Sequence, residues 1–365
     1  MSGVDRVGRA PAIARDLLAW FDARERDVPW RRERDPYRVW VAEVMAQQTR
    51  IDTVRAYYRD FLERFPDVDA LAAAPLDDVL RVWQGLGYYA RARHLHRAAR
   101  VVSERHGGVL PSTVEGLLEL PGVGAYTAGA IASLAFGRPE PAVDGNARRV
   151  LSRLFDLAEP TPATLERSAR GLIAAAPDRP AAINQAVMDL GGAVCTWRAP
   201  VCAECPLRDP CLARARATQA RRPPRRRKAP RPRRRAVAAL VTRGDRVLLV
   251  RRPADGLLGG LWDLPAVPLA REDGGEPELR RVLAAYLAER LAIAVRVGDR
   301  LETVEHAFSH FRLRLDVFAA VWRSGEPPRD PEWTWASADR VEELATPGYL
   351  RAIEPHVQPL RRRRA

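Results

Sequence analysis

Residues 115–136 decide the fold of the first half of the chain and read EGLLELPGVGAYTAGAIASLAF. Two helical patterns flank Pro121-Gly122-Val123-Gly124, where the glycines permit a tight turn. Backbone N–H groups in such a turn, with the start of the next helix, can bind a phosphate. A Pro-Gly-x-Gly turn alone is more often an ordinary helix–helix connection, so only the whole string favours phosphate binding.

Two acidic residues stand out. Asp144 lies near this turn in the sequence, and Glu43 lies on a neighbouring helical pattern. Asp144 follows two prolines and precedes Gly145 and Asn146, where it either caps the next helix or is free for chemistry. Glu43 lies on an apolar helix face, and burial would raise its pKa and keep it a proton donor. A satisfied structural acid is the alternative for Glu43. Two carboxyl groups with separated pKa values are what cleavage of a glycosidic bond requires.

Four cysteines fall within 17 residues, with the spacing C-x6-C-x2-C-x5-C. They are Cys195, Cys202, Cys205 and Cys211. Close spacing of four thiols is typical of a zinc site or an iron–sulfur cluster. Zinc sites usually contain two Cys-x2-Cys pairs, and this segment has one, so the pattern favours a [4Fe–4S] cluster with a structural role.

Together these motifs resemble the endonuclease III superfamily of helix-hairpin-helix DNA glycosylases. The string PYRVWVAEVMAQQTR (36–50) resembles its adenine glycosylase (MutY) branch. The resemblance implies that Glu43 protonates adenine N7, that Asp144 stabilises the sugar cation or traps it covalently, and that Asn146 orients Asp144 or a water.

Tyr126 occupies the position at which bifunctional members of the superfamily carry a Schiff-base lysine. Lys228 is the only lysine of the chain and lies in an Arg/Pro-rich stretch. We therefore predict a monofunctional enzyme that leaves an abasic site, with strand cleavage through the N-terminal amine left open. Thymine-mismatch relatives also carry tyrosine at this position.

The resemblance assigns further residues to DNA and to the base. Gln48, Leu86 and Tyr88 match residues that enter the DNA stack, while Arg31 and Asp189 match positions near the bound adenine. From the sequence alone, Gln48 could be a surface amide, Tyr88 a core aromatic residue, and Asp189 a cap near the cysteines.

The Arg/Pro-rich segment 219–235 divides the chain and is expected to be an extended linker, either without contacts or along DNA phosphates. We predict an all-α domain over residues 1–218, with the iron–sulfur loop at 195–211, and an α+β domain over 236–365. Residues 236–252 predict a hairpin, 301–322 a strand pair and 276–291 a helix.

Residues 246–267 resemble the start of a Nudix-type domain. The helix at 276–291 lacks the carboxylate set that holds magnesium in Nudix pyrophosphatases, so a binding role is expected. Phe308, Ser309 and His310 match the loop by which adenine glycosylases recognise 8-oxoguanine. A β-turn serine beside a surface histidine is the alternative.

The composition agrees with a DNA-binding enzyme. The chain has 365 residues, a formal net charge of +14, and no apolar run long enough for a membrane helix. Positive charge favours nucleic acid, although an Arg-rich genome also produces it. The start resembles an amphipathic helix, not a signal peptide, so a cytoplasmic, nucleoid-associated protein is expected.

These observations predict a monomeric hydrolase of base excision repair, acting on adenine opposite 8-oxoguanine or guanine in double-stranded DNA. Two alternatives remain open: a glycosylase of the same fold for thymine in T·G mismatches or oxidised pyrimidines, and a DNA-binding protein without catalysis.

Overall fold

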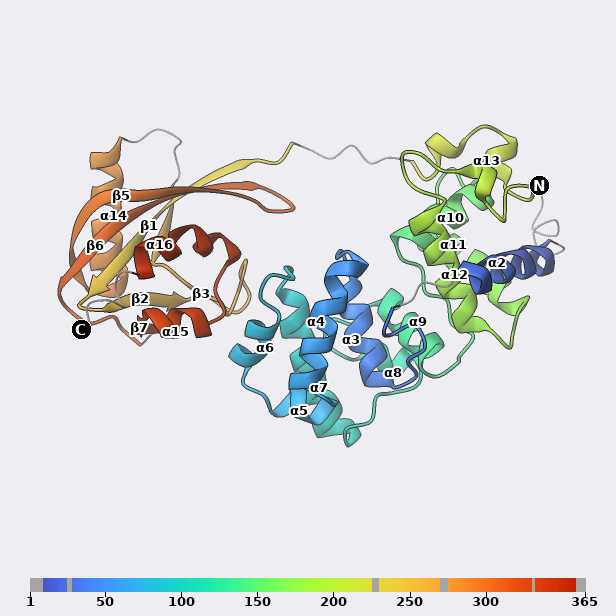
Figure 1. Cartoon of the computed structure of the whole chain (residues 1–365), viewed down its shortest axis with the longest axis horizontal. Coiled ribbons are helices and arrows are strands. Elements are labelled where there is room, and N and C mark those ends of the chain that lie inside the picture. Colours follow the sequence, from blue (N-terminus) through green and yellow to red (C-terminus); the bar gives the residue numbers. More distant parts are fainter. Residues whose placement is uncertain (1–8, 25–27, 225–229, 270–274, 330–331, 359–365) are drawn as a thin grey trace. The chain divides into compact units, whose positions relative to one another are not determined.

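The computed structural model describes residues 9–24, 28–224, 230–269, 275–329 and 332–358, which group into two compact units (Figure 1). One unit comprises Met1–Ala73 and His94–Arg227, and the other Ala74–Arg93 and Lys228–Ala365. The helix expected at the N-terminus is present from Ala10, as α2, while its first eight residues and the centre of the Arg/Pro-rich segment, including Lys228, lie outside the described residues. Strand β1 begins at Arg233, inside the segment expected to be linker.

The first unit is helical, as predicted. Its helices are α2 (Ala10–Arg24), α3 (Pro36–Ala46), α4 (Ile51–Arg64), α5 (Val68–Ala73), α7 (Ala90–His106, which begins in the other unit's segment), α8 (Val114–Leu118), α9 (Ala125–Leu134), α10 (Gly145–Leu154), α11 (Pro162–Ala174), α12 (Pro180–Ala193) and α13 (Leu212–Ala215), with short 3-10 turns η1 (Cys202–Glu204) and η2 (Gln219–Arg221). The two helices predicted around the glycine turn are α8 and α9.

Helices α2, α10, α11 and α12 share one core, in which leucines such as Leu17, Leu151, Leu172 and Leu190 are buried. Burial of each such side chain contributes about 1.5–3 kcal/mol relative to exposure. This core holds α10, whose first residues follow Asp144, against α12, which leads into the cysteine segment. The catalytic candidates therefore start from a rigid support.

The helical pattern over residues 39–65 is interrupted, which differs from the continuous pattern in the sequence. Helix α3 ends at Ala46 and α4 begins at Ile51. Gln48 between them has a φ of 57°, the left-handed region that non-glycine residues rarely adopt. The Gln47 side chain donates a 3.1 Å hydrogen bond to Thr127 Oγ1, so a tertiary contact favours the break.

The second unit is an α+β domain with a mixed sheet, joined by the segment that contains α6 (Leu76–Val82). Its strands are β1 (Arg233–Arg243), β2 (Arg246–Arg251), β3 (Trp262–Asp263), β4 (Ala266–Leu269), β5 (Ala294–Ala307), β6 (Arg312–Ser324) and β7 (Trp333–Ser337). The order is β3-β2-β1-β6-β5, with β4 pairing with β1 and β7 with β2. The predicted hairpin is β1–β2, and the predicted strand pair is β5–β6.

Alternation along β1 divides the domain into two apolar layers. Val237, Ala239 and Val241 face the layer that α14 (Glu276–Leu291) covers, whereas Ala238 and Leu240 face the other side. The second layer is closed by α15 (Ala338–Glu343), the 3-10 helix η3 (Gly348–Ile353) and α16 (Glu354–Val357). Helices thus cover both faces of the sheet (Figure 1).

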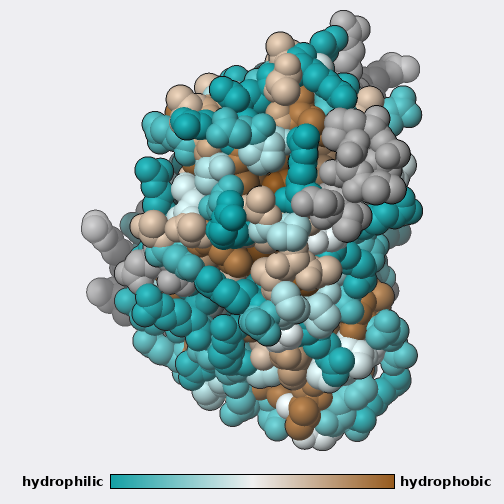
Figure 2. All heavy atoms as spheres, turned by 90° about the vertical axis from the view of Figure 1, so that its right-hand side faces the viewer, coloured by the Kyte–Doolittle hydropathy of each residue, from teal (hydrophilic) through white to brown (hydrophobic). Residues whose placement is uncertain are grey.

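Surface chemistry agrees with an aqueous environment for the part seen. Viewed from the side of α2, the surface is mainly hydrophilic, and apolar residues appear as small patches between polar ones (Figure 2). Within the described ranges, every helix is too short or too polar to cross a membrane.

Candidate active site of the helical unit

Glu43 lies on α3 and is buried, with 8 % of its surface exposed. Its Oε2 accepts a 2.5 Å hydrogen bond from the Tyr126 hydroxyl, which also lies 3.7 Å from Met188 Sδ. Burial raises the pKa of Glu43, the bond from Tyr126 opposes this, and the charge of Asp144 raises it further. Glu43 therefore holds its proton more readily than an exposed glutamate does. The sequence alone did not indicate that Tyr126 would contact it.

Asp144 is the N-cap of α10. Its Oδ1 accepts a 2.6 Å bond from the backbone N–H of Ala147, and its Oδ2 accepts a 3.1 Å bond from Asn146 Nδ2. Burial raises the pKa of Asp144, but both bonds favour its ionised form, as does the positive end of the helix. The two interpretations of Asp144 are thus compatible, because the residue that caps α10 also lines the cavity beside it.

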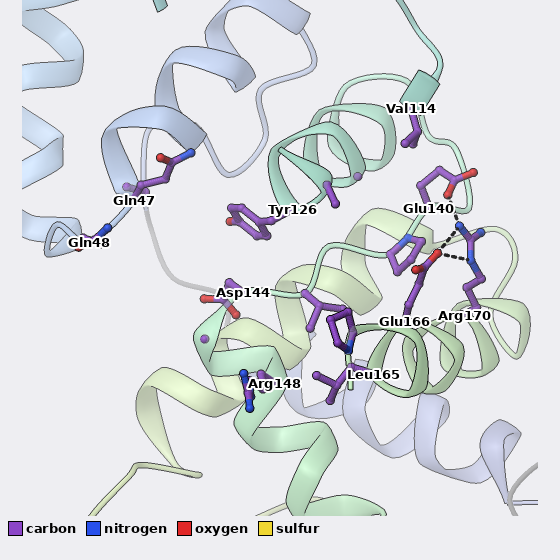
Figure 3. A pocket seen from close by; sticks show the side chains of 17 residues that line it. Gln47, Gln48, Val114, Tyr126, Glu140, Asp144, Arg148, Leu165, Glu166 and Arg170 are labelled. Carbon is purple, nitrogen blue, oxygen red and sulfur yellow. Dashed lines mark hydrogen bonds and ion pairs between the residues drawn. The ribbon is translucent and has the colours of Figure 1, made fainter. Parts of the chain in front are cut away.

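A cavity of about 790 Å³ adjoins these groups. Tyr126 and Asp144 line it from opposite sides, and Gln47 and Gln48 lie at one end (Figure 3). The size suits a flipped nucleoside. Glu43 is not among the lining residues, whereas its partner Tyr126 is. A base must therefore enter deeply, or the site must tighten, before Glu43 reaches it.

The other end of the cavity is polar. Arg170 forms ion pairs of 2.8 Å with Glu140 and 3.0 Å with Glu166, and all three residues line the wall (Figure 3). Glu166 and Arg170 lie four residues apart on α11, whereas no signal in the sequence indicated that Glu140, from a separate segment, would join them.

Arg149 is a buried residue that the sequence interpretation missed. Its Nη2 donates to Asn146 Oδ1 (2.8 Å) and to the carbonyl of Gly191 (2.6 Å), and its Nε donates to the carbonyl of Cys195 (2.7 Å). Since Asn146 in turn donates to Asp144, this guanidinium connects the carboxylate to the first cysteine. The only available hint was an arginine one turn after Asp144.

Arg31 and Asp189, both expected near the base, are paired with each other at 2.6 Å and are nearly buried. The guanidinium of Arg31 also lies 5.5 Å from the ring centroid of Phe21. Asp189 lies inside α12, so it is not a cap. The positive charge of Arg31 lowers the pKa of Glu43 slightly, which places the pair within electrostatic range of the acid.

The four cysteines line one small cavity, together with Arg153. Arg153 Nη1 lies 3.4 Å from Cys195 Sγ, and the same side chain donates to the backbone carbonyls of Thr196 and Trp197. Burial raises the pKa of the Cys205 thiol to about 12, so a bound cation would be needed to ionise it. Among the residues that the structure describes, no three His, Cys, Asp or Glu side chains converge on a single ion position.

The glycine turn is built as the sequence predicts. Gly122 has a φ of +78°, and a Cβ there would lie 2.4 Å from His94 Cβ, so glycine is required twice over. Val123 is buried and anchors the turn. Gly124 is the N-cap of α9 with an ordinary φ of −99°, and a Cβ would meet open space. Its missing side chain leaves the start of α9 open to an approaching phosphate.

The wedge candidates differ in exposure. Gln48 is exposed, in the left-handed backbone region. In the other unit, Tyr88 has 44 % of its surface exposed and a φ of 52°, and Arg91 lies 5.3 Å from its ring centroid. Leu86 is buried in this structure. Gln48 and Tyr88 are therefore available for contact as the structure stands, and Leu86 is not.

The predicted lesion-recognition loop is the turn between β5 and β6. The backbone N–H of Phe308 donates to the carbonyl of Phe311 (2.9 Å), and the two rings stack with centroids 4.6 Å apart. Ser309 and His310 are exposed at the tip, and Ser309 Oγ lies 3.3 Å from His310 Nδ1. The aromatic base fixes the turn, so that two polar side chains face outward.

Comparison with known protein families matches both halves of the chain. The HhH-GPD superfamily base excision DNA repair protein family matches residues 41–175, and the NUDIX domain family matches residues 236–353.

Curated relatives match most of the chain. The human adenine DNA glycosylase is 37 % identical over 88 % of this chain and 69 % of its own length. The mouse adenine DNA glycosylase is 35 % identical over 98 % of this chain and 80 % of its own. A solved structure of a thermostable thymine-DNA glycosylase has a TM-score of 0.53 and 28 % identity, covering 57 % of this chain and 98 % of that one.

Proposed function

The chain belongs to the adenine DNA glycosylase family, and from that premise we propose that it removes adenine paired with 8-oxoguanine and leaves an abasic site. It is a DNA glycosylase of base excision repair, which hydrolyses an N-glycosidic bond. The single observation that carries the proposal is a pair of carboxyl groups at a base-sized cavity: Asp144 lines the cavity, and Glu43 accepts a hydrogen bond from Tyr126, which also lines it.

The environments of the two carboxyl groups suit opposite roles. Glu43 has one hydrogen-bond donor and lies in apolar surroundings, so it carries the proton. Asp144 accepts two hydrogen bonds at a helix N-terminus, which oppose the rise in its pKa caused by burial, so we assign it the role of the anion. Separation of this kind assigns the acid and the stabilising group in glycoside hydrolysis.

In the reaction, Glu43 gives its proton to N7 of the flipped adenine. The bond between C1′ of the sugar and N9 then breaks, and adenine leaves with the bonding electron pair. Asp144 stabilises the cationic sugar until a water adds to C1′ and passes its proton to the Glu43 carboxylate, which restores the acid. Asn146 keeps one Asp144 oxygen in place through its 3.1 Å bond.

The product is an abasic site without lysine-dependent strand cleavage. Position 126 is tyrosine, and the sole lysine of the sequence lies outside the catalytic half. A lysine in the catalytic half is thus not present to form a Schiff base with the abasic site. Slow cleavage of the DNA strand would have to use the N-terminal amine.

Recognition of the opposite base belongs to Ser309 and His310. The serine hydroxyl can donate and accept, which suits the N7–H and O8 edge of 8-oxoguanine. Exposure of both side chains at the β5–β6 turn supports this assignment.

Cys195, Cys202, Cys205 and Cys211 would hold a [4Fe–4S] cluster, for which the shared cavity and the donor from Arg153 are suited. When bound, the cluster supplies positive charge that ionises the thiols and ties the segment after α12 together.

Excision assays on three duplexes test the proposal: adenine opposite 8-oxoguanine, thymine opposite guanine, and thymine glycol opposite adenine. We expect breaks at adenine that appear only after alkali. Glu43→Gln should abolish excision while binding of the duplex persists, since the amide keeps the shape and the acceptor for Tyr126. Near-normal excision by that variant would remove Glu43 from its role.

A thymine-specific enzyme is the second candidate, favoured by Tyr126 and by the structural likeness to a thymine-DNA glycosylase. That likeness covers 57 % of this chain, whereas the mouse adenine glycosylase matches 98 % of it. Excision of thymine in the assay above, without excision of adenine, would establish this candidate instead.

A further inference from the structure

The groove at the start of β1 contains more arginine charge than the carboxylates around it neutralise. A hollow of about 470 Å³ is lined by Arg233, Arg234, Arg235, Arg312, Arg314 and Glu305, with neighbouring parts of the β5–β6 hairpin. Arg235 pairs with Asp316 at 2.9 Å, and Arg314 lies 3.7 Å from the same carboxylate. Over the described ranges, Arg233, Arg234 and Arg312 have no carboxylate partner.

The register brings like charges side by side. Strands β1 and β6 are parallel, and Arg233 pairs with Arg312 and Arg235 with Arg314. Like charges on directly paired residues destabilise a sheet. An anion bound between them would offset that repulsion, so the cost is consistent with a site for a negatively charged ligand.

The groove continues into the lesion-recognition loop. Ala307 lines the groove and pairs with Arg312, and the next four residues form the turn that exposes Ser309 and His310. The guanidinium of Arg234 lies 4.5 Å from the ring centroid of Phe311, so the aromatic base of the loop also orients an arginine. A strand whose base meets the loop would have its neighbouring phosphates at the groove.

We propose that this arginine groove binds backbone phosphates of the DNA strand that presents its base to Ser309 and His310. The ligand is a run of phosphodiester groups, held by arginines as multiple-donor cations. The strand assignment rests on the proposed function, whereas phosphate binding by the groove does not.

The test compares two full-length triple variants with the same change of charge. One replaces Arg233, Arg234 and Arg312 by Gln. The control replaces three exposed arginines elsewhere in the domain, Arg281 and Arg290 on α14 and Arg323 near the other end of β6, by Gln. Binding is measured from 50 to 200 mM salt with a duplex that carries 8-oxoguanine opposite a tetrahydrofuran abasic site, which excludes turnover.

Each lost phosphate contact lowers the slope of log K against log salt by about 0.9. Three contacts therefore lower it by about 2.7, and the advantage of the unmodified protein over the groove variant shrinks about 40-fold across this fourfold change in salt. The control should keep most of the slope. Equal losses in both variants, or no loss in the groove variant, would overturn the proposal.

Single methylphosphonate linkages next to 8-oxoguanine locate the contact. A neutral linkage should weaken binding by the unmodified protein and leave the groove variant unaffected. If the triple variant does not fold, Arg312→Gln with the same linkages gives the answer. Displacement by 10 mM inorganic phosphate at constant ionic strength, without any effect of the neutral linkages, would make the groove a small-anion site and refute the DNA assignment.

Failure of the proposed function gives a different result. The ratio of affinities for 8-oxoguanine and guanine duplexes should be the same in the groove variant and the unmodified protein, because phosphates are common to both. A ratio of one in the unmodified protein would refute lesion recognition while the salt result stood.

Discussion

Tyr126→Phe removes one hydroxyl from the centre of the site. The substitution loses the 2.5 Å hydrogen bond to Glu43 Oε2 and the 3.7 Å contact with Met188 Sδ. While Glu43 holds its proton, the bond joins uncharged groups and contributes about 0.5–1.5 kcal/mol, a decrease in melting temperature of about 1–6 °C for a domain of this size. As Glu43 gives up its proton in the reaction, the bond becomes one to a charged group and is worth about 1.5–3 kcal/mol.

The rate and its pH dependence should change in different directions. If all of the lost interaction acts on the transition state, excision slows by about 10- to 150-fold. The bond from Tyr126 lowers the pKa of Glu43, so its removal raises that pKa. Glu43 acts while protonated, and the alkaline limb of the single-turnover rate must therefore move to higher pH, although the plateau is lower.

Tyr37→Phe is the matched control. Tyr37 is buried in the same unit, and its hydroxyl donates a 2.8 Å bond to the carbonyl of Phe65, away from the carboxyl pair. The control should lose comparable stability without a shift of the limb. A Tyr126→Phe limb at lower or unchanged pH would show that Tyr126 does not tune Glu43.

Two further substitutions test the surrounding support. Arg149→Gln removes the donors to Asn146 Oδ1 and to the buried Gly191 carbonyl, the latter at about 1–3 kcal/mol, whereas the Cys195 carbonyl keeps a 3.3 Å bond from Arg153. The melting temperature and excision should both fall, because Asn146 loses its partner. Excision unchanged after correction for the unfolded fraction would exclude a positioning role. Gly122→Ala should lower both the stability and the affinity for any duplex, because its Cβ collides with His94. Gly124→Ala should lower the affinity for the duplex and leave the melting temperature unchanged. A lower melting temperature of Gly124→Ala would contradict the open space at that position.

Local patterns were sufficient for the elements that carry chemistry. The turn around Gly122, the β1–β2 hairpin and the helix at 276–291 each follow from residues adjacent in sequence, and all three are confirmed. The break between α3 and α4 was not predictable in this way. It contains neither glycine nor proline, and the bond from Gln47 to Thr127 connects residues 80 positions apart.

Contacts within the site could not be predicted from the sequence for the same reason. Glu43 and Tyr126 are 83 positions apart, and Arg149 reaches Cys195 over 46. Motif matching identified the residue types on each side but not the bond between them. Arg149 carries no motif of its own, because its function as a donor exists only once α10 and α12 have packed.

The close packing of α9 explains why these separate pieces form one site. Gly129 lies less than one turn after Tyr126, and a Cβ at Gly129 would lie 2.0 Å from the carbonyl of Pro141. The backbone that leads into Asp144 is therefore in direct contact with α9, at a distance that no side chain would allow. Tyr126 and Asp144 are fixed relative to each other through this contact, and Tyr126 fixes Glu43. The distance between Glu43 and Asp144 is thus set by the close contact of the α9 backbone with the backbone at Pro141. This contact explains how a cavity wide enough for a base can still hold both carboxyl groups in place.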